Sequence, residues 1–382
     1  MRKLKVNILS PGRFHVLDLA RELDKNGFDV KFYSYVPTKR AAMFGLPSKC
    51  NVSFLWLLLP ILGLYRITKR AKWTLELRRV VQDIITATFM RKCDILISMS
   101  GEFHRSNLRV KKDGGIVIIE RGSKHILEQK RILESIPSLS GKIIVSQSNV
   151  EREIADYELA DFISIAAQHV KNSFIKHGYP ETKIFVNPYG VELSMFKPLP
   201  GVVKEFDLIM TGGWCYRKGC DILVEAIKKT NFHILHVGNI LDVPFPDHPQ
   251  FTHVDKVNQP ELINYYNKSR VFVLPSREEG MALVQAQAVS CNLPIVGSPD
   301  SGAEDFKKYI DNPQFVNIVE SLSVDNVVKS IYKAVEQSKE IDNSKKYAGE
   351  GLNNLTWEAY GKRYAEFLKQ IELNHNSIND NL

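Results

Sequence analysis

The stretch 274–288 combines residue types that suit recognition of a phosphorylated sugar. A short apolar strand opens the stretch, two carboxylates and a glycine follow, and a helix of small residues begins near Leu283. The backbone N–H groups of Met281, Ala282 and Leu283 would lie at the start of that helix, where unsatisfied donors and the helix dipole favour a phosphate. Glu279 lies in the same loop and can accept hydrogen bonds from sugar hydroxyls. An ordinary helix start preceded by acidic residues fits the pattern equally well.

A second loop, residues 212–219, is bounded by glycines and holds the adjacent cations Arg217 and Lys218. Two fixed cations suit a diphosphate, because the leaving group gains negative charge as its bond to the sugar breaks. An Arg-Lys pair in a loop more often forms a solvated surface. Here the pair opens the second half of the chain, upstream of Glu279, and this position favours the diphosphate.

Together these loops resemble the donor site of glycosyltransferase family 4, a family of retaining enzymes with the GT-B fold. Pro275-Ser276, then Glu279-Gly280, and Gln287-Ala288 after an apolar stretch match the family signature of two glutamates separated by seven residues. The resemblance implies that Glu279 contacts the transferred sugar. Gln287 departs from the pattern, because it replaces the glutamate that binds the ribose hydroxyls. Its amide still accepts a hydrogen bond but lacks the charge.

The resemblance assigns further roles by position. Arg217 and Lys218 become the diphosphate ligands, so that neither a metal nor another cofactor is expected. His125, in the loop after the predicted strand 116–119, would contact the donor sugar, although a lone histidine is more often structural. Gly12 would let the backbone approach the donor. His15 is not selected as a site residue, because it fits equally well as the first residue of a helix. The expected donor-binding set is Gly12, Arg217, Lys218, Gly280, Met281, Ala282, Leu283 and Gln287.

The elements that would position these loops occur twice along the chain. Strand 4–10, a glycine turn, helix 15–26 and strand 30–35 form the opening of a doubly wound α/β domain. The same order restarts near residue 206. Further apolar strands are predicted at 94–98, 116–119, 142–145, 162–165, 183–186, 206–210, 233–237, 271–274 and 294–297, and helices at 170–177, 221–229, 325–337 and about 357–373.

We therefore expect an α/β chain with GT-B architecture, in which two Rossmann-like domains face a central cleft. Residues 1–195 would form the acceptor-binding domain and residues 196–356 the donor-binding domain. Residues 357–373 would form a helix that returns to the first domain, and 374–382 a flexible tail. Weaker similarities to the family, including Asn187–Glu192 at the crossing between the domains, keep the family's order from about residue 5 to 370.

Charge and apolar residues are concentrated near the N-terminus. The net charge is +8, and residues 1–100 hold 18 Lys and Arg against 7 Asp and Glu. The apolar run 54–65, which is followed by cations, suits an anionic bilayer surface, although a buried helix with a solvated face fits as well. The run is too short to span a membrane, and Pro60 interrupts it. The expected membrane-facing residues are Trp56, Arg66, Lys69, Arg70 and Lys72.

The basic N-terminus lacks the apolar run of a secretory signal, and five widely spaced cysteines fit reduced thiols. We expect a cytoplasmic protein, with docking on the inner face of the plasma membrane as a further hypothesis. The resemblance implies a retaining hexosyltransferase that moves a sugar from a UDP- or GDP-sugar to a hydroxyl of a glycan or lipid-linked acceptor, in bacterial surface polysaccharide biosynthesis.

Three alternatives stay open. The first is a nucleotide-sugar epimerase of the same fold. The second is a family member that binds the donor without turnover, as Gln287 suggests. The third is a non-catalytic basic protein that binds nucleotides or nucleic acid, although no nucleic-acid-binding signature appears in the sequence and nucleic acid is not an expected partner.

Overall fold

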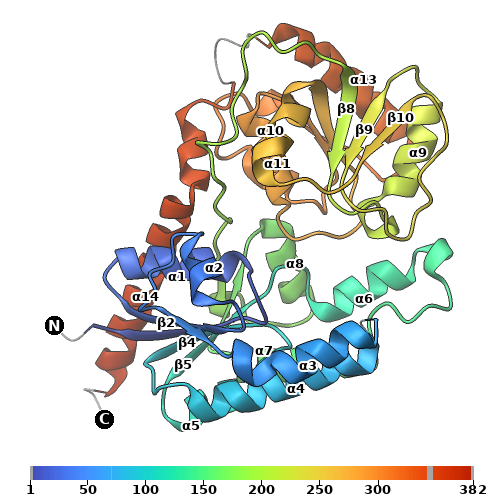
Figure 1. Cartoon of the computed structure of the whole chain (residues 1–382). Helices are drawn as coiled ribbons and strands as arrows, with labels where there is room; N and C mark the ends of the chain where they lie inside the picture. The colour runs from blue at the N-terminus through green and yellow to red at the C-terminus, as the bar shows by residue number, and fades with distance from the viewer. Residues whose placement is uncertain (1–2, 70, 342–346, 380–382) are drawn as a thin grey trace.

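A computed structural model describes residues 3–69, 71–341 and 347–379, with side chains as far as residue 373. Two parallel β-sheets, each covered by helices, form two domains that lie one above the other in Figure 1. The central strands of each sheet are short apolar segments that are buried on both faces, which is the pattern expected of parallel strands, whereas edge strands such as β3 and β10 are partly exposed.

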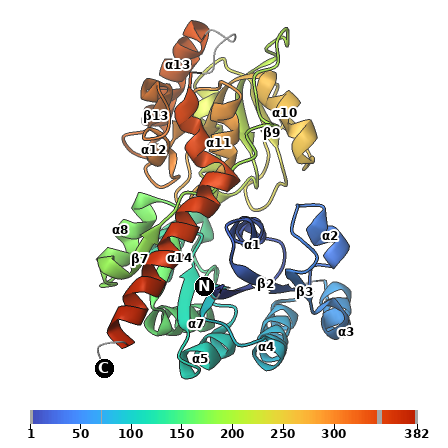
Figure 2. The ribbon, with the colours of Figure 1, turned by 90° about the vertical axis from the view of Figure 1, so that its left-hand side faces the viewer.

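The N-terminal sheet has seven parallel strands in the order β3-β2-β1-β4-β5-β6-β7. Helix α1 lies on one face of this sheet, and α4, α5 and α7 lie on the other (Figure 2). The strands are β1 (Lys5–Leu9), β2 (Asp29–Ser34), β3 (Asn51–Ser53), β4 (Ile95–Met99), β5 (Ile116–Glu120), β6 (Phe162–Ile165) and β7 (Ile184–Val186). The helices are α1 (His15–Lys25), α2 (Thr38–Ala42), α3 (Leu55–Ile67), α4 (Lys72–Phe89), α5 (His104–Lys112), α6 (Ile126–Glu134), α7 (Gln147–Leu159) and α8 (Gln168–Lys176).

The C-terminal sheet has six parallel strands in the order β10-β9-β8-β11-β12-β13. Helices α9 and α13 pack against each other beside it. The strands are β8 (Phe206–Thr211), β9 (Ile234–Val237), β10 (Phe251–Val254), β11 (Ser269–Leu274), β12 (Ile295–Gly297) and β13 (Val316–Ile318). The helices are α9 (Cys220–Lys228), α10 (Gln259–Asn267), α11 (Leu283–Ser290), α12 (Ala303–Phe306) and α13 (Val324–Glu340).

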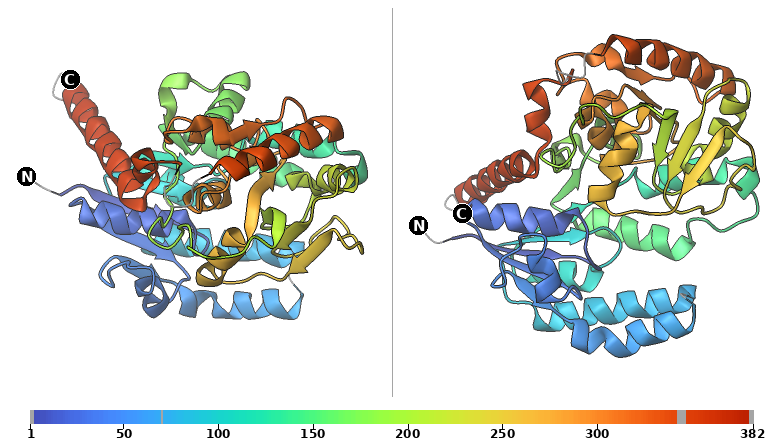
Figure 3. Two further views of the ribbon diagram at one scale, coloured as in Figure 1. Left: turned by 90° about the horizontal axis from the view of Figure 1, so that it is seen from above. Right: turned by 45° about the horizontal axis from the view of Figure 1, so that its top comes forward.

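The last helix, α14 (Trp357–Asn379), leaves the C-terminal domain and lies along the N-terminal domain (Figure 2). It packs against α1, and a Cβ atom on its Gly361 would lie 2.2 Å from Cβ of Glu22. Phe367 of α14 stacks on Phe185 of β7, with ring centroids 3.9 Å apart. The start of β1 and the end of α14 lie on the same side of the molecule (Figure 3).

The structure confirms the expected GT-B architecture, including the returning helix. It also confirms eight of the nine further strands that were predicted between residues 94 and 297. The strand predicted at 142–145 is wrong, because these residues form a loop before α7. Strands β5 and β6 pair directly with each other, which leaves no place between them for another strand. Ile143 is largely exposed instead. The sequence patterns missed β3, β10 and β13, and α14 continues six residues beyond its expected end.

Candidate functional site

The predicted diphosphate and sugar residues meet above neighbouring strands. Strands β8 and β11 pair with each other, yet the chain continues from β8 toward one edge of the sheet and from β11 toward the other. Such a switch point is where open α/β sheets bind ligands, beyond the carboxyl ends of the strands. The loop with Arg217 and Lys218 follows β8, and the loop with Glu279 follows β11.

Glu279 binds both cations. Lys218 Nζ lies 2.7 Å from Glu279 Oε2, and Arg217 Nη1 lies 3.2 Å from Glu279 Oε1. Burial alone would raise the pKa of the Glu279 carboxyl, but Lys218 and Arg217 outweigh it and lower the pKa to about 2. Glu279 is therefore ionised at neutral pH, and it is the carboxylate nearest to both cations.

A second ion pair holds the two loops together. Arg277 donates to both carboxylate oxygens of Asp221, at 2.6 and 2.7 Å, and to the carbonyl oxygen of Tyr216 at 2.6 Å. Its backbone N–H donates to the carbonyl oxygen of Arg217 at 2.9 Å. A bidentate Arg–carboxylate pair fixes geometry as well as charge, so Arg277 and Asp221 position the cationic loop. Neither residue was predicted from the sequence to belong to the site.

Two glycines allow the backbones around the site to approach each other closely. Gly219 has φ +72°, and a Cβ atom there would lie 2.0 Å from the carbonyl oxygen of Pro275. A Cβ atom on Gly280 would lie 1.9 Å from the carbonyl oxygen of Gly122 in the N-terminal domain. No other residue fits either position without moving the backbone.

The start of α11 lies beside these charges. Among the described residues, no acceptor bonds the backbone N–H groups of Met281, Ala282 or Leu283. These unsatisfied donors and the helix dipole favour an anion at this end of the helix. Gln287 lies one turn further along, nearly buried, with its Oε1 accepting a hydrogen bond from the Tyr266 hydroxyl at 3.1 Å.

Glu278, beside Glu279 in the chain, connects the two domains. Its buried carboxylate accepts hydrogen bonds from the Ser123 hydroxyl, from the Lys124 backbone N–H at 3.3 Å and from Gln129 Nε2 at 3.1 Å. Lys124 Nζ also pairs with Asp300 at 2.7 Å. The sequence did not reveal this role, because Glu278 and Glu279 are adjacent and identical in type.

His125 and Gly12 belong to the N-terminal domain. His125 Nδ1 accepts from the Leu127 N–H at 3.3 Å and so caps α6, and the ring stacks on His177 at 4.5 Å. Burial and His177 lower the pKa of His125 to about 4. Gly12 follows β1 and faces the Tyr35 hydroxyl. Among the described residues, neither contacts Arg217, Lys218 or Glu279 directly, so their roles stay predictions.

The described residues contain no cluster of three or more His, Cys, Asp or Glu side chains arranged to hold a metal ion. They also contain no helix that is both long enough and apolar enough to cross a membrane.

The expected membrane-facing residues lie on and after α3. Trp56 is 81% exposed, and Arg66, Lys69 and Lys72 are exposed as well. Leu58 of α3 is fully buried and Leu62 packs partly buried against the core, whereas Leu57 and Leu59 are exposed. Contact of this helix with a membrane stays a prediction. Arg70 lies outside the described residues. On α4, the exposed side chains Trp73, Leu77, Val80 and Ile84 follow helical spacing and extend the apolar surface.

The two-domain arrangement with its returning helix is the GT-B fold. Sucrose-phosphate synthase from Thermosynechococcus elongatus matches it with a TM-score of 0.65 at 13% identity, over 97% of this chain and 100% of that chain. HepE from Anabaena, solved in complex with UDP-glucose, matches with a TM-score of 0.64 at 12% identity, over 96% and 100% of the two chains.

Residues 205–336 match the family model of glycosyl transferases group 1, so this part of the chain is a glycosyl transferases group 1 domain. A phosphatidylinositol N-acetylglucosaminyltransferase subunit from Arabidopsis thaliana is 24% identical over 202 residues, which cover 48% of this chain and 44% of that protein. A probable sucrose-phosphate synthase from Thermosipho melanesiensis is 23% identical over 254 residues, which cover 58% and 57% of the two proteins. The chain spans about half the length of these two relatives.

Proposed function

We propose that the chain is a glycosyltransferase that uses a nucleoside diphosphate sugar as its donor. The observation that carries this proposal is the cluster of Arg217, Lys218 and Glu279 beside the free N–H groups at the start of α11. The two cations and the helix start would bind the diphosphate, and Glu279 would orient the sugar. As the glycosidic bond breaks, the same cations would stabilise the charge on the departing diphosphate.

The donor class is also supported by a structural neighbour, because HepE is solved with UDP and with UDP-glucose. Family 4 membership, retention at the anomeric carbon and the roles of Gln287, His125 and Gly12 come from the sequence resemblance and belong to this proposal. The proposal also includes a hexose as the transferred sugar, a hydroxyl acceptor on a glycan or a lipid-linked molecule, and chemistry without a metal. The proposed setting is bacterial surface polysaccharide assembly.

The proposal is tested in two steps. A thermal-shift screen of the purified chain against UDP, GDP, ADP and their sugars should give stabilisation by one base, with the nucleotide sugar at least as effective as the nucleotide. The selected donor is then incubated with the chain, and nucleoside diphosphate and sugar products are followed. Release of the diphosphate with glycoside formation supports transfer. Interconversion of the donor without release would identify an epimerase, and the absence of any stabilisation would contradict donor binding.

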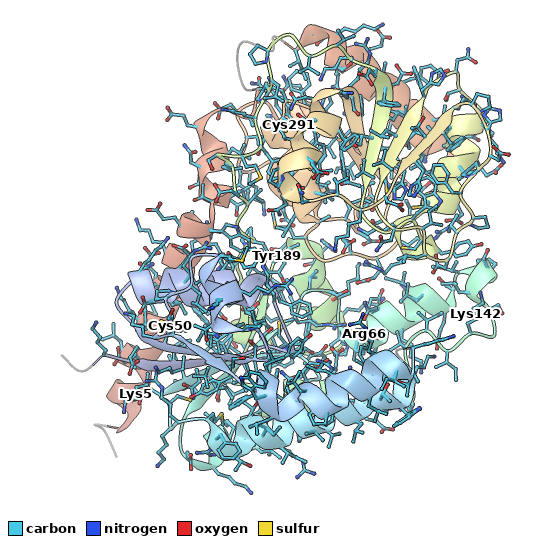
Figure 4. The ribbon with its side chains drawn as sticks, in the orientation of Figure 1. Lys5, Cys50, Arg66, Lys142, Tyr189 and Cys291 are labelled. Carbon is cyan, nitrogen blue, oxygen red and sulfur yellow. The ribbon has the colours of Figure 1, made fainter. Side chains whose placement is uncertain are left out.

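We further propose that α3 and the start of α4 dock on an anionic membrane, which would bring a lipid-linked acceptor to the N-terminal domain. The exposed apolar side chains would enter the interface, while Arg66, Lys69 and Lys72, which have no carboxylate partner among the described residues, would meet lipid head groups. Arg66 lies on the side of the domain away from α14 (Figure 4). The relative named as a phosphatidylinositol N-acetylglucosaminyltransferase subunit fits a lipid acceptor.

Liposome flotation tests the membrane proposal. The chain should float with vesicles that contain anionic lipid and remain unbound with neutral vesicles at moderate salt. Trp56→Ala should reduce flotation, whereas Tyr332→Ala, which removes an exposed aromatic side chain from α13 in the other domain, should leave it unchanged. Equal binding to both kinds of vesicle, or none to either, would contradict the proposal.

A further inference from the structure

A histidine and a buried carboxylate form a pair at the switch point of the N-terminal sheet. The order β3-β2-β1-β4-β5-β6-β7 reverses direction between β1 and β4, so the loop after β1 is where this sheet would bind a ligand. His15 follows that loop as the first residue of α1. Its Nε2 lies 2.9 Å from Oε2 of Glu120, the last residue of β5.

Glu120 is held by more than His15. The Tyr364 hydroxyl, from α14, donates to Glu120 Oε1 at 2.8 Å, so the pair is completed only when α14 lies on the N-terminal domain. The Glu120 side chain is 1% exposed, whereas that of His15 is 11% exposed. A carboxylate accepts hydrogen bonds and does not donate them. Glu120 therefore places the proton of a neutral His15 ring on Nε2 and leaves Nδ1 as an acceptor.

His15 Nδ1 is available for a ligand. Among the described residues, Nδ1 has no hydrogen-bond partner. It is also not one of the unpaired polar atoms that are fully enclosed by the protein, so a ligand can reach it. The His15 ring also packs against the ring of Tyr189, and the two ring centroids lie 4.2 Å apart. Tyr189 belongs to the segment that crosses between the domains and lies at their boundary in Figure 4. The ring is thus fixed in orientation and tautomer, which is how a substrate-binding histidine is prepared.

A short series of contacts connects this pair to the donor loop. The Tyr189 hydroxyl lies against Gly122, and the carbonyl oxygen of Gly122 lies against Gly280, next to Glu279. His15 and Glu279 therefore stand on the two sides of the same domain boundary. No charged side chain other than Glu120 forms an ion pair with His15 in the described residues.

We propose that His15 binds a hydroxyl group of the sugar substrate through Nδ1, with Glu120 as its positioning residue. The inference rests on the proposed glycosyltransferase function and adds a substrate contact from the N-terminal domain. The hydroxyl donates to Nδ1, while Nε2–H donates to Glu120. The hydroxyl belongs either to the transferred sugar or to the acceptor, and the two sources have different kinetic signatures.

Two variants separate a ligand contact from a structural role. His15→Gln places an amide near the position of Nε2, so it can keep the contact with Glu120 but lacks an acceptor at Nδ1. His15→Asn places an amide oxygen near the position of Nδ1 and gives up the contact with Glu120. A role in ligand binding predicts that the Asn variant binds substrate better than the Gln variant, and a purely structural role predicts the reverse. His233→Gln, an exposed histidine of the C-terminal domain, is the matched control.

The measurement is the affinity for UDP and UDP-glucose, or for the guanine pair if the screen selects it, together with the KM for the acceptor. The first quantity of interest is the ratio of the affinity for UDP-glucose to the affinity for UDP. For a contact with the transferred sugar, His15→Gln should lower this ratio by about 3- to 10-fold. For a contact with the acceptor, this ratio stays fixed and the acceptor KM rises by the same factor. In both cases the affinity for the nucleotide alone is unchanged.

If His15→Gln alters neither quantity, or performs better than His15→Asn, the inference is overturned. If the wild-type chain binds no nucleotide, the proposed function fails, and this inference fails with it.

Discussion

Glu279 in the loop after β11 and Lys218 in the loop after β8 form an ion pair of 2.7 Å, and Arg217 contacts the same carboxylate. The residues proposed to hold the sugar and the diphosphate are therefore in direct contact with each other. A diphosphate that binds the two cations competes with Glu279 for them. Its negative charge would replace that of the carboxylate as the partner of Arg217 and Lys218.

Replacing Glu279 with glutamine should separate binding from transfer. The amide no longer competes for Arg217 and Lys218, so the affinity for the nucleoside diphosphate should stay equal or rise. Transfer should fall by about 100-fold or more, because the carboxylate proposed to orient the sugar is lost. Nucleotide titration and initial rates check the two halves of the prediction. A parallel loss of nucleotide affinity would contradict the assignment of Glu279 to the sugar.

Gln287→Glu tests the departure from the family pattern. Gln287 Oε1 already accepts a hydrogen bond from Tyr266, and a carboxylate there should accept more strongly from the ribose hydroxyls. We expect donor affinity to rise about 3- to 10-fold, measured by calorimetry. The same gain should appear with the nucleotide and the nucleotide sugar, because the ribose is common to both. An unchanged or weaker affinity would place position 287 away from the ribose.

The stability of the fold should fall on mild acidification. Burial lowers the pKa of His125 and of His236 to about 4 in the folded chain, against about 6.5 when unfolded. The unfolded chain then binds more protons between these values, so the free energy of unfolding decreases as the pH falls from about 6.5 to 4.

Urea unfolding across this pH range checks the effect. His125→Asn can keep a side-chain acceptor for the Leu127 N–H while it removes one titrating ring, so its unfolding free energy should depend less steeply on pH. An identical pH dependence in the variant and the wild type would show that His125 titrates normally.

The packing of α14 on α1 can be tested at a glycine. Gly361→Ala would place a Cβ atom 2.2 Å from Glu22 Cβ, and the helices must separate to accommodate it. We expect a loss of about 1–3 kcal/mol in the free energy of unfolding. Gly63→Ala on α3 is the control, because a Cβ atom there meets nothing within 4 Å and helix propensity favours alanine. Equal effects of the two substitutions would contradict the described packing.

Local patterns predicted much of this arrangement because strands buried on both faces are continuous apolar runs. They failed at Ile143 and Ile144, where an apolar run lies in an exposed loop and only the pairing of β5 with β6 excludes a strand. In the candidate site, Arg217, Lys218 and Glu279 were predicted from their residue types and the family resemblance to share one site, and their side chains do meet. Glu120, Glu278 and Arg277 were missed, because their partners lie far away in the sequence and only the fold brings them together.

Nucleotide binding by a variant without the two loop cations tests the central claim most directly. In Arg217→Met/Lys218→Met, the affinity for the nucleoside diphosphate selected by the screen should fall at least about 100-fold, because two charge-assisted contacts are lost. Lys228→Met/Lys229→Met removes two adjacent exposed cations from the same domain and should bind as the wild type does. Thermal melting confirms that each variant is folded before titration. Unchanged affinity and turnover in the 217/218 variant would contradict the account.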